Sequence, residues 1–466
     1  TLASGSGGSA IRGLVINEFD GHGIRVASNN NEIACNFIGV GQAGTVALPN
    51  GLDGVHVTGN NNRIGGDSAA LRNVISGNLG SGVEIAGAGA TGNKVKGNII
   101  GLAAGGGAAL GNGASGVEID AAVNSVVGGN SPVEGNIISA NGQHGVRIHS
   151  GAAGNAVRGN TIGLNQAGTA DRGNAGSGVI LDNAPDNFVG GVNTDYGNLI
   201  AGNGGNGVLV QGGASSNNIR HNRIGLDANG AALPNDGAGV RFNVSSDNWV
   251  GDNTIWYNGQ GGVIVLSNGQ QNRIRANSIY QNAGLGIDLD NDGVTPNDGA
   301  GDPDTGANGL QNFPVITDID FTAGTVDATL TSTGNMQFTV DLFSSAQCDA
   351  SGYGEGQTFL GTYTGISSGG GVLNLTQPLS GLVDGEYLTA VATDANNNSS
   401  EFSTCVEIVG CPDADVDNDN DVDVADITLV ASRWNNPGQY DPAYDLTCDG
   451  VIDMRDIIVV TRSFGT

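Results

Sequence analysis

NEIACNFIG (residues 31–39), NKVKGNIIG (93–101), NAVRGNTIG (155–163) and NNIRHNRIG (217–225) are four versions of one motif. Each copy starts 62 residues after the one before it, and each keeps two asparagines five residues apart and a closing Ile-Gly pair. A period this regular is typical of repeat architectures, in which one structural unit stacks on the next. The motif therefore predicts a stacked fold.

Each 62-residue unit contains two halves, marked by short segments that begin with Gly-Val or Gly-Ile. They start at Gly23, Gly54, Gly82, Gly116, Gly145, Gly178, Gly207, Gly239, Gly262 and Gly286. Their alternating apolar positions predict strands, and because the spacing is too long for hairpins each strand should pair with the next coil. The sequence thus predicts a parallel solenoid of about ten coils, with Ile and Val inside. Asparagines should stack as hydrogen-bonded ladders and tolerate left-handed backbone at the corners.

The coil motifs NxIxxNxIG and GIxL resemble those of the right-handed parallel β-helix repeat family, the pectin-lyase-like solenoids, over residues 10–290. This resemblance implies a mainly β fold with short parallel strands on every coil. It says almost nothing about activity, because the fold carries lyases, glycosidases, adhesins and assembly proteins alike.

Beyond residue 315 the pattern changes to longer alternating segments joined by Gly, Ser and Asn turns. The segments are VDATLTSTG (326–334), MQFTVDLFSS (336–345), TFLGTYTG (358–365), GGVLNLTQPL (370–379) and EYLTAVATDA (386–395). They predict a small antiparallel β-sandwich, which resembles immunoglobulin-like or fibronectin-like modules and which we interpret as a spacer. The predicted domains are a β-helix (1–311), a sandwich (312–410) and a small α-helical tail (411–466).

The tail contains DVDNDNDVDVAD (415–426), whose oxygens fall at the positions of a calcium loop. The ligands would be Asp415, Asp417, Asp419, the carbonyl of Asp421, Asp423 and Asp426. The pattern returns in DLTCDGVIDMRD (445–456), where the ligands would be Asp445, Thr447, Asp449, the carbonyl of Val451, Asp453 and Asp456. An apolar run follows each loop, at 427–434 and 457–464, and predicts a helix packed after it.

Two loop-helix units of this kind resemble a type I dockerin over residues 413–464. The resemblance implies that the tail binds two Ca²⁺, folds only when they are bound, and docks onto another protein, usually a cohesin. Asn420 replaces the expected Gly of the first loop. Val424-Ala425 and Met454-Arg455 stand where many dockerins place a Ser/Thr pair, so the partner stays open between a cohesin-like protein and a neighbouring copy of this chain.

The third residue of each Gly-Val strand should point out of the solenoid, so that these residues form one exposed stripe. The stripe comprises Arg25, His56, Glu84, Glu118, Arg147, Ile180, Leu209, Arg241, Ile264 and Asp288. Glu84 and Glu118 would be neighbours, and with His56, Arg147 and His149 nearby an acid/base site can be imagined. The alternative is an ordinary solvated face with opposite charges paired across strands, and we favour it because the stripe lacks an Asp cluster and is poor in aromatic residues. No catalytic residue is therefore assigned from the sequence.

A second acidic group occupies residues 284–304. It consists of Asp288, Asp290, Asp292, Asp298, Asp302 and Asp304. These oxygens could hold a further Ca²⁺ near 288–304, or they could form a polar cap that covers the edge of the last strand.

The formal net charge is −29, from 46 acidic and 17 basic residues, which disfavours nucleic acid as a partner. No apolar run is long enough for a membrane span, so we expect no direct membrane insertion. Cys348 and Cys405 bracket one predicted domain and Cys411 and Cys448 another, and pairing within each would leave Cys35 alone. We expect an oxidising location, extracellular or at the cell surface.

We interpret the chain as a secreted, bacterial, non-catalytic structural or adhesive surface protein. Its calcium-dependent tail would couple it to another protein or to neighbouring copies, as in a homopolymeric filament. Two alternatives stay open: a polysaccharide lyase or glycoside hydrolase attached to a scaffold through the tail, and a glycan-binding adhesin.

Overall fold

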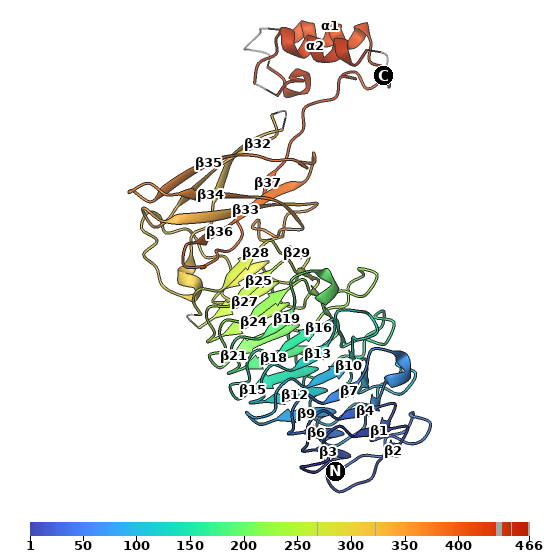
Figure 1. Ribbon diagram of the computed structural model, residues 1–466. Helices are drawn as coiled ribbons and strands as arrows, with labels where there is room; N and C mark the ends of the chain where they lie inside the picture. The colour runs from blue at the N-terminus through green and yellow to red at the C-terminus, as the bar shows by residue number, and fades with distance from the viewer. Residues whose placement is uncertain (268, 322, 435–439, 449, 465–466) are drawn as a thin grey trace.

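The computed structural model describes residues 1–466 except 268, 322, 435–439, 449 and 465–466. A solenoid, an antiparallel β region and a small helical tail follow one another along an elongated molecule (Figure 1). Among the described residues no helix is long and apolar enough to cross a membrane.

The solenoid is built from three parallel sheets of ten strands each, and every coil contributes one short strand to each sheet. The first sheet contains β1 (Ala10–Arg12), β4 (Glu32–Ala34), β7 (Arg63–Gly65), β10 (Lys94–Lys96), β13 (Val126–Gly128), β16 (Ala156–Arg158), β19 (Phe188–Gly190), β22 (Asn218–Arg220), β25 (Trp249–Gly251) and β28 (Arg273–Arg275). The second contains β2 (Val15–Ile16), β5 (Phe37–Ile38), β8 (Val74–Ile75), β11 (Ile99–Ile100), β14 (Ile137–Ile138), β17 (Thr161–Ile162), β20 (Leu199–Ile200), β23 (Arg223–Ile224), β26 (Thr254–Trp256) and β29 (Ser278–Tyr280). The third contains β3 (Ile24–Val26), β6 (Val55–Val57), β9 (Val83–Ala86), β12 (Val117–Asp120), β15 (Val146–His149), β18 (Val179–Asp182), β21 (Val208–Gln211), β24 (Val240–Asn243), β27 (Val263–Leu266) and β30 (Ile287–Leu289).

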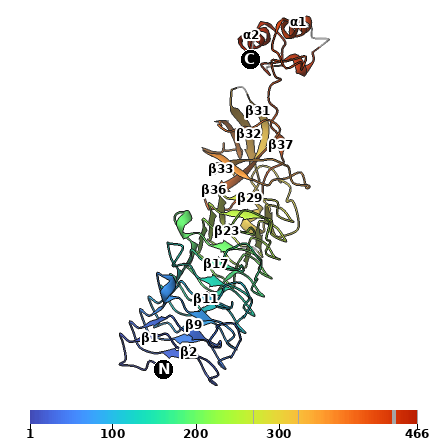
Figure 2. The same cartoon turned by 90° about the vertical axis from the view of Figure 1, so that its right-hand side faces the viewer.

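The predicted parallel β-helix of ten coils is therefore confirmed, and the Gly-Val strands of the sequence are the strands of the third sheet. Figure 2 shows strands of the second sheet, among them β11, β17 and β23, stacked in order along the rod. The Ile of each Ile-Gly pair is fully buried, and Ile100 lies in register with Ile75 on one side and Ile138 on the other. Each such Ile contributes roughly 1.5–3 kcal/mol through burial, so the column of identical residues is a substantial part of the stabilising core.

The asparagine ladders are also confirmed. The side-chain amide of Asn98 donates to Asn136 Oδ1 at 3.0 Å, and that of Asn136 donates to Asn160 Oδ1 at 3.0 Å. The left-handed corners, however, lie one residue earlier than predicted: Gly97 and Gly159, which precede ladder asparagines, have φ of 65°. The asparagine itself stays out of that conformation because its side chain has to point along the stack to reach the next coil.

The antiparallel region consists of two sheets around an apolar core that includes Val326, Phe338, Leu342 and Leu388. One sheet contains β31 (Val315–Asp320), β32 (Thr325–Thr331) and β35 (Val372–Pro378), and the other β34 (Thr358–Ile366), β33 (Gln337–Ser345), β36 (Tyr387–Asp394) and β37 (Val406–Glu407). The five predicted strands are all present, and β31 and β37 were not predicted. A disulfide joins Cys348 to Cys405.

The antiparallel region closes the C-terminal end of the solenoid. Glu355 ends one asparagine ladder, because its Oε1 accepts hydrogen bonds from the backbone and side-chain amides of Asn282, both at 3.1 Å. The Arg275 guanidinium donates to Asp341 Oδ1 at 2.6 Å, and Phe402 joins the solenoid core. These contacts cover a strand edge that would otherwise be open to pairing with another chain.

The tail contains two α-helices, α1 (Val424–Arg433) and α2 (Met454–Arg462). Both begin three residues before the predicted apolar runs, because Asp423 and Asp453 cap their N-termini in capping boxes. The short 3-10 helices of the chain are η1 (Ala69–Leu71), η2 (Thr194–Tyr196), η3 (Ala307–Leu310) and η4 (Pro442–Tyr444). A second disulfide joins Cys411 to Cys448, and Cys35 is the free cysteine.

Candidate functional site

The first tail loop brings three carboxylates together. Ligand oxygens of Asp415, Asp417 and Asp426 lie within 4.8 Å of one another. Asp426 is fully buried, and its Oδ1 accepts from the backbone amides of Val416 at 2.7 Å and Asp417 at 3.1 Å. Burial and the nearby carboxylates raise the pKa of Asp417. Several converging, all-oxygen groups of this kind fit the preference of Ca²⁺.

The second tail loop repeats the arrangement around Asp456, which is also fully buried. Its Oδ1 accepts from the backbone amide of Thr447 at 2.9 Å, and its Oδ2 from that of Asp453 at 2.7 Å. Asp445 Oδ2 accepts from the Gly450 amide at 2.8 Å. Asp449, the fifth-position ligand of the sequence prediction, lies outside the described residues.

The remaining predicted ligands shape the loops. Asp423 accepts from the Ala425 amide at 2.6 Å as the cap of α1, which suits a ninth position that often reaches calcium through water. Asp419 accepts from the Asp421 amide at 2.9 Å. Asn420 has φ of 71° and Gly450 has φ of 77°, so the sixth residue of each loop makes the same left-handed turn. The Asn-for-Gly departure in the first loop is therefore tolerated.

The acidic group at 288–304 divides into two parts. Asp298, Asp302 and Asp304 place ligand oxygens within 4.8 Å of one another, and burial raises the pKa of Asp302 to about 6. Asp290 Oδ2 instead accepts from the Ala307 amide at 3.0 Å and so holds η3 against the last coil. Asp288 is buried, which raises its pKa to about 6 as well.

A row of polar side chains, all but one of them ionisable, runs along the exposed face of the third sheet over its first coils. We call it the charged row. It consists of His22, Asp53, His56, Ser81, Glu84, Glu118, His144, Arg147 and His149. His56, Glu84, Glu118 and Arg147 are register partners on β6, β9, β12 and β15, as the stripe predicted. The sequence reasoning missed His22, Asp53 and His144. Each of the three stands directly before the glycine that opens a Gly-Val or Gly-Ile segment. Residues at this position form a second stripe beside the first, and this is the sequence signal by which they could have been found.

Glu118 is the best-connected member of the charged row. Its Oε1 lies 2.9 Å from His149 Nε2 and accepts from Arg147 at 3.2 Å, while its Oε2 accepts from Ser81 Oγ at 2.8 Å. The hydrogen bond from His149 lowers the pKa of Glu118, so this carboxylate is ionised at neutral pH. Burial and the charge of Arg147 lower the pKa of His144.

His56 occupies the other end of the charged row. Its Nδ1 lies 2.5 Å from Glu84 Oε2 and 3.7 Å from Asp53 Oδ2. Hydrogen bonds with Asp53 and Glu84 raise the pKa of His56 to about 9, so the imidazole is protonated at neutral pH.

The exposed stripe does not continue along the whole rod. Ile180 and Ile264 keep the predicted register but are buried, and Asp288 is buried as well. Ile264 lies against the turn at Gly261, and the last coil is covered by Phe402 and its neighbours. The prediction of ten exposed positions is therefore wrong at these three. Ile264 folds back onto its own turn, and Asp288 accepts from backbone amides of residues 291–293.

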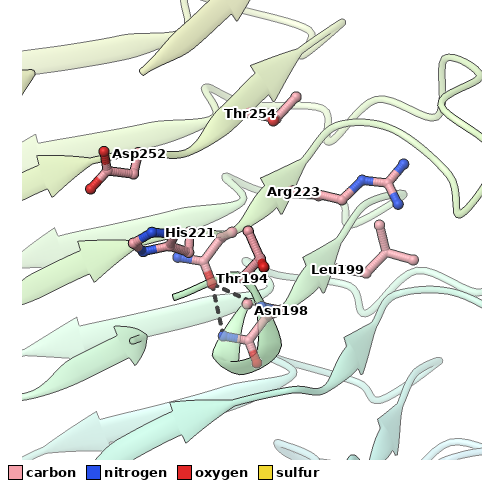
Figure 3. Close-up of a pocket in the computed structure, with 9 residues that line it drawn as sticks. Thr194, Asn198, Leu199, His221, Arg223, Asp252 and Thr254 are labelled. Carbon is pink, nitrogen blue, oxygen red and sulfur yellow. Dashed lines mark hydrogen bonds between the residues drawn. The ribbon is translucent and has the colours of Figure 1, made fainter. Parts of the chain in front are cut away.

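A pocket of about 340 Å³ opens elsewhere on the solenoid, around His221, Arg223 and Asp252 (Figure 3). His221 Nδ1 donates to the Gly191 carbonyl at 2.9 Å, which leaves Nε2 facing away from that bond. His221 stands at a corner where two other repeats have glycine, a signal that the sequence reasoning overlooked. Trp249 lies between two cations, with Arg220 at 3.9 Å and Arg273 at 4.7 Å from its ring, so its indole face is occupied.

The three parallel sheets define the class of this protein as a parallel β-helix protein. Residues 172–298 match the family described as "Right handed beta helix region". No curated protein matches the chain in sequence.

Solved structures similar to the chain include carbohydrate-active β-helix proteins. The A-module of mannuronan C-5 epimerase AlgE4 from Azotobacter vinelandii shares 17% identity, covering 59% of this chain and 71% of that one, with a TM-score of 0.34. Tailspike protein 2 of Escherichia coli O157:H7 bacteriophage CAB120 shares 13% identity over 86% of this chain and 61% of its own, with a TM-score of 0.31. A tailspike protein, gp49, from Acinetobacter baumannii bacteriophage Fri1, described as a capsular polysaccharide depolymerase, shares 9% identity over 85% and 86%, with a TM-score of 0.28. No residue of this chain is assigned a role from them.

Proposed function

We propose that this is a protein of the extracytoplasmic space that acts on a polysaccharide along the charged row and is coupled to a partner by its calcium-loaded tail. The observation that supports action on a polysaccharide is the Glu118–His149 pair. An ionised carboxylate hydrogen-bonded to an imidazole can accept one proton and return it, which is what a lyase requires when it removes a proton from the sugar ring and protonates the leaving oxygen. The two disulfides fit an oxidising compartment.

The charged row suits an extended substrate better than a small one. It crosses several consecutive coils on an open face, so successive sugar units can lie along the rod and meet the same kinds of groups. Arg147, which donates to Glu118, is positioned to attract an acidic sugar next to the proton-transfer pair. Glu84 is hydrogen-bonded to His56 and not to Glu118. The proposed proton transfer therefore involves Glu118 with His149 and does not involve Glu84.

This function is tested by incubating the full chain, in millimolar Ca²⁺, with a panel of neutral and acidic polysaccharides and measuring new reducing ends. We expect one polymer class to be cleaved, with a loss of at least about 100-fold in rate for Glu118→Gln and for His149→Ala. Arg241→Ala, on the same stripe but outside the charged row, is the matched control and should cleave at the parental rate. An unchanged rate in both row variants would remove this pair from the reaction.

The tail is proposed to bind two Ca²⁺, one in each loop, and to dock onto a partner in that state. The support is the repeated hydrogen-bond pattern around two buried carboxylates, Asp426 and Asp456. Around them, Val424, Met454 and Ile458 are exposed apolar side chains on α1 and α2, a surface that suits either a cohesin-like protein or another copy of this chain. Isothermal titration of metal-free protein should give two calcium ions per chain, and one in Asp426→Ala or Asp456→Ala.

The non-catalytic structural or adhesive interpretation is the second candidate, and the coupling surface of the tail is the observation that favours it. Negative-stain microscopy of the full chain in Ca²⁺ and in chelator separates the two. Ordered filaments that appear only with Ca²⁺, combined with no cleavage of any polymer, would establish an assembly protein. Single rods in both conditions, together with cleavage, would establish the polysaccharide-directed function.

A further inference from the structure

Two of the five histidines of the chain meet at the N-terminal end of the charged row. The rings of His22 and His56 are stacked, with centroids 4.3 Å apart and an angle of 21° between their planes. His22 comes from the turn that enters β3, and His56 lies on β6 of the next coil. Asp53 enters from the turn before β6, and Glu84 from β9 on the third coil.

Ligand atoms of His22, Asp53 and His56 lie within 4.8 Å of one another. Asp53 Oδ2 lies 2.9 Å from His22 Nδ1 and 3.7 Å from His56 Nδ1, and His56 Nδ1 lies 2.5 Å from Glu84 Oε2. In a tetrahedral site with metal–ligand bonds of about 2.0–2.1 Å, ligand atoms are about 3.3 Å apart. The distances from Asp53 Oδ2 to the two imidazoles, 2.9 and 3.7 Å, lie on either side of this spacing, whereas the 2.5 Å contact of His56 with Glu84 is a hydrogen bond.

One contact in the cluster is unexplained by hydrogen bonding. His22 Nδ1 is buried and has no hydrogen-bond partner, although the Asp53 oxygen is 2.9 Å away. The nitrogen and the oxygen are not aligned for an N–H···O hydrogen bond. They face each other as two ligands of one metal ion do. A buried polar atom left in this state is costly, and a metal ion would satisfy it.

Asp53 is itself held in place for such a role. Its Oδ1 accepts from the backbone amide of Ser81 at 2.7 Å, which fixes the carboxylate and leaves Oδ2 directed at both imidazoles. Carboxylates and imidazoles that bind metals are commonly oriented in this way by a second hydrogen bond.

We propose that His22, Asp53 and His56 form a binding site for a divalent transition metal, with Zn²⁺ as the preferred ion, and that Glu84 orients His56 through a hydrogen bond. Binding releases the proton that His56 carries in the metal-free protein, because a ligating imidazole has to be neutral. Two imidazole nitrogens and one carboxylate oxygen, with water as the fourth ligand, suit Zn²⁺, whereas Ca²⁺ selects sites made entirely of oxygen. The site is distinct from the tail loops in both position and chemistry. Because its ligands come from two successive coils, the ion fastens the first coils of the solenoid together.

The test is equilibrium dialysis of the full chain against Zn²⁺ in saturating Ca²⁺, which keeps the oxygen loops filled. We expect one tightly held Zn²⁺ per chain, with an affinity at least 10-fold lower for His22→Ala and for His56→Ala. His221→Ala, which removes a histidine far from the cluster, should bind like the parent. Zn²⁺ should also raise the melting temperature of the parent and of His221→Ala but not of the double variant His22→Ala/His56→Ala.

The absorption spectrum of bound Co²⁺ reports its coordination geometry. A purely structural role of these residues would not produce such a spectrum. Four-coordinate Co²⁺ absorbs visible light far more strongly than the hexaaqua ion, so the parent with Co²⁺ should show an intense band that Zn²⁺ displaces. The proposal is overturned if the double variant binds Zn²⁺ with the stoichiometry and affinity of the parent, or if the parent gives only the weak spectrum of hydrated Co²⁺.

Discussion

The solenoid and the tail satisfy their buried polar groups in opposite ways. In the solenoid, the buried Asn136 accepts from Asn98 and donates to Asn160, so that each coil supplies the partner of the next. In the described part of the tail, the buried polar side chains are the carboxylates of Asp426, Asp445 and Asp456, which accept from backbone amides and line the proposed calcium positions. The buried polar groups of the rod therefore find their partners within the chain, whereas under the proposed function those of the tail would also need an ion from the solution.

The two regions also differ in how much apolar core supports them. The solenoid has one continuous column of Ile and Val over ten coils, to which Phe343 and Phe402 of the antiparallel region add at the closed end. The tail buries only a few apolar side chains, with Val430 and Val460 at its centre. A core this small rarely stabilises a fold without a disulfide or a metal. The tail has the Cys411–Cys448 disulfide, and under the proposed function it would also be stabilised by two Ca²⁺.

Removal of calcium is expected to have the largest effect, and to be confined to the tail. Each ion present at 1,000 times its Kd stabilises the folded state by about 4 kcal/mol, so chelation should abolish α1 and α2. Far-ultraviolet circular dichroism and limited proteolysis would follow this: helical signal and protease resistance of 411–466 should be lost while the rod stays intact. Equal loss of the rod would show that the two regions are not independent.

Interruption of an asparagine ladder should be next in size and confined to the rod. Asn136→Ala removes the acceptor of the Asn98 backbone amide, one of the two acceptors of the Asn98 side-chain amide, and the side-chain donor to the Val95 carbonyl, at a cost of about 3–5 kcal/mol in unfolding free energy. Chemical denaturation of the rod measures this. Asn229→Ala, on an exposed loop, is the control and should cost less than about 0.5 kcal/mol.

The closed end of the rod should respond to pH through Glu355. Burial raises the pKa of Glu355 to about 7, well above its value in an unfolded chain. The folded state thus binds more protons than the unfolded state between about pH 4.5 and 7, and stability from this group falls as pH rises through that window, by about 2–3 kcal/mol. The melting temperature of Glu355→Gln should not show this decrease with rising pH, in contrast to the parent. The same pH dependence in both proteins would assign the effect to other groups.

The smallest effect on stability is expected in the charged row. Arg147 is partly exposed and pairs with Glu118 at 3.2 Å, so Arg147→Ala should change rod stability by less than about 1 kcal/mol. Under the proposed function the same variant should weaken binding of an acidic polymer by about 10-fold, measured by affinity electrophoresis. A loss of stability without any change in polymer binding would mean that the Arg147–Glu118 pair only stabilises the rod.

Much of the fold could be predicted from the sequence because the residues that determine it recur at regular intervals. The spacing of Ile38, Ile100, Ile162 and Ile224 indicates that every second coil presents the same side chain to the same interior column, and the ladder asparagines follow by the same reasoning. The calcium ligands of the tail were predicted in the same way, from fixed spacing within 12 residues, and they stay a prediction. The corners were misplaced by one residue, because spacing does not say which residue of a turn has the left-handed backbone.

The sequence alone determined the stacked coils, the outward stripe that contains Glu118, and the two acidic loops, since each depends on residues at regular or short separation. Only the tertiary structure decided which outward side chains meet: that His22 stacks on His56 from the next coil, that Glu118 pairs with His149, and that Glu355 ends a ladder begun hundreds of residues earlier. Contacts across coils depend on turn geometry and side-chain direction. Neither follows a period, and so neither can be read from spacing.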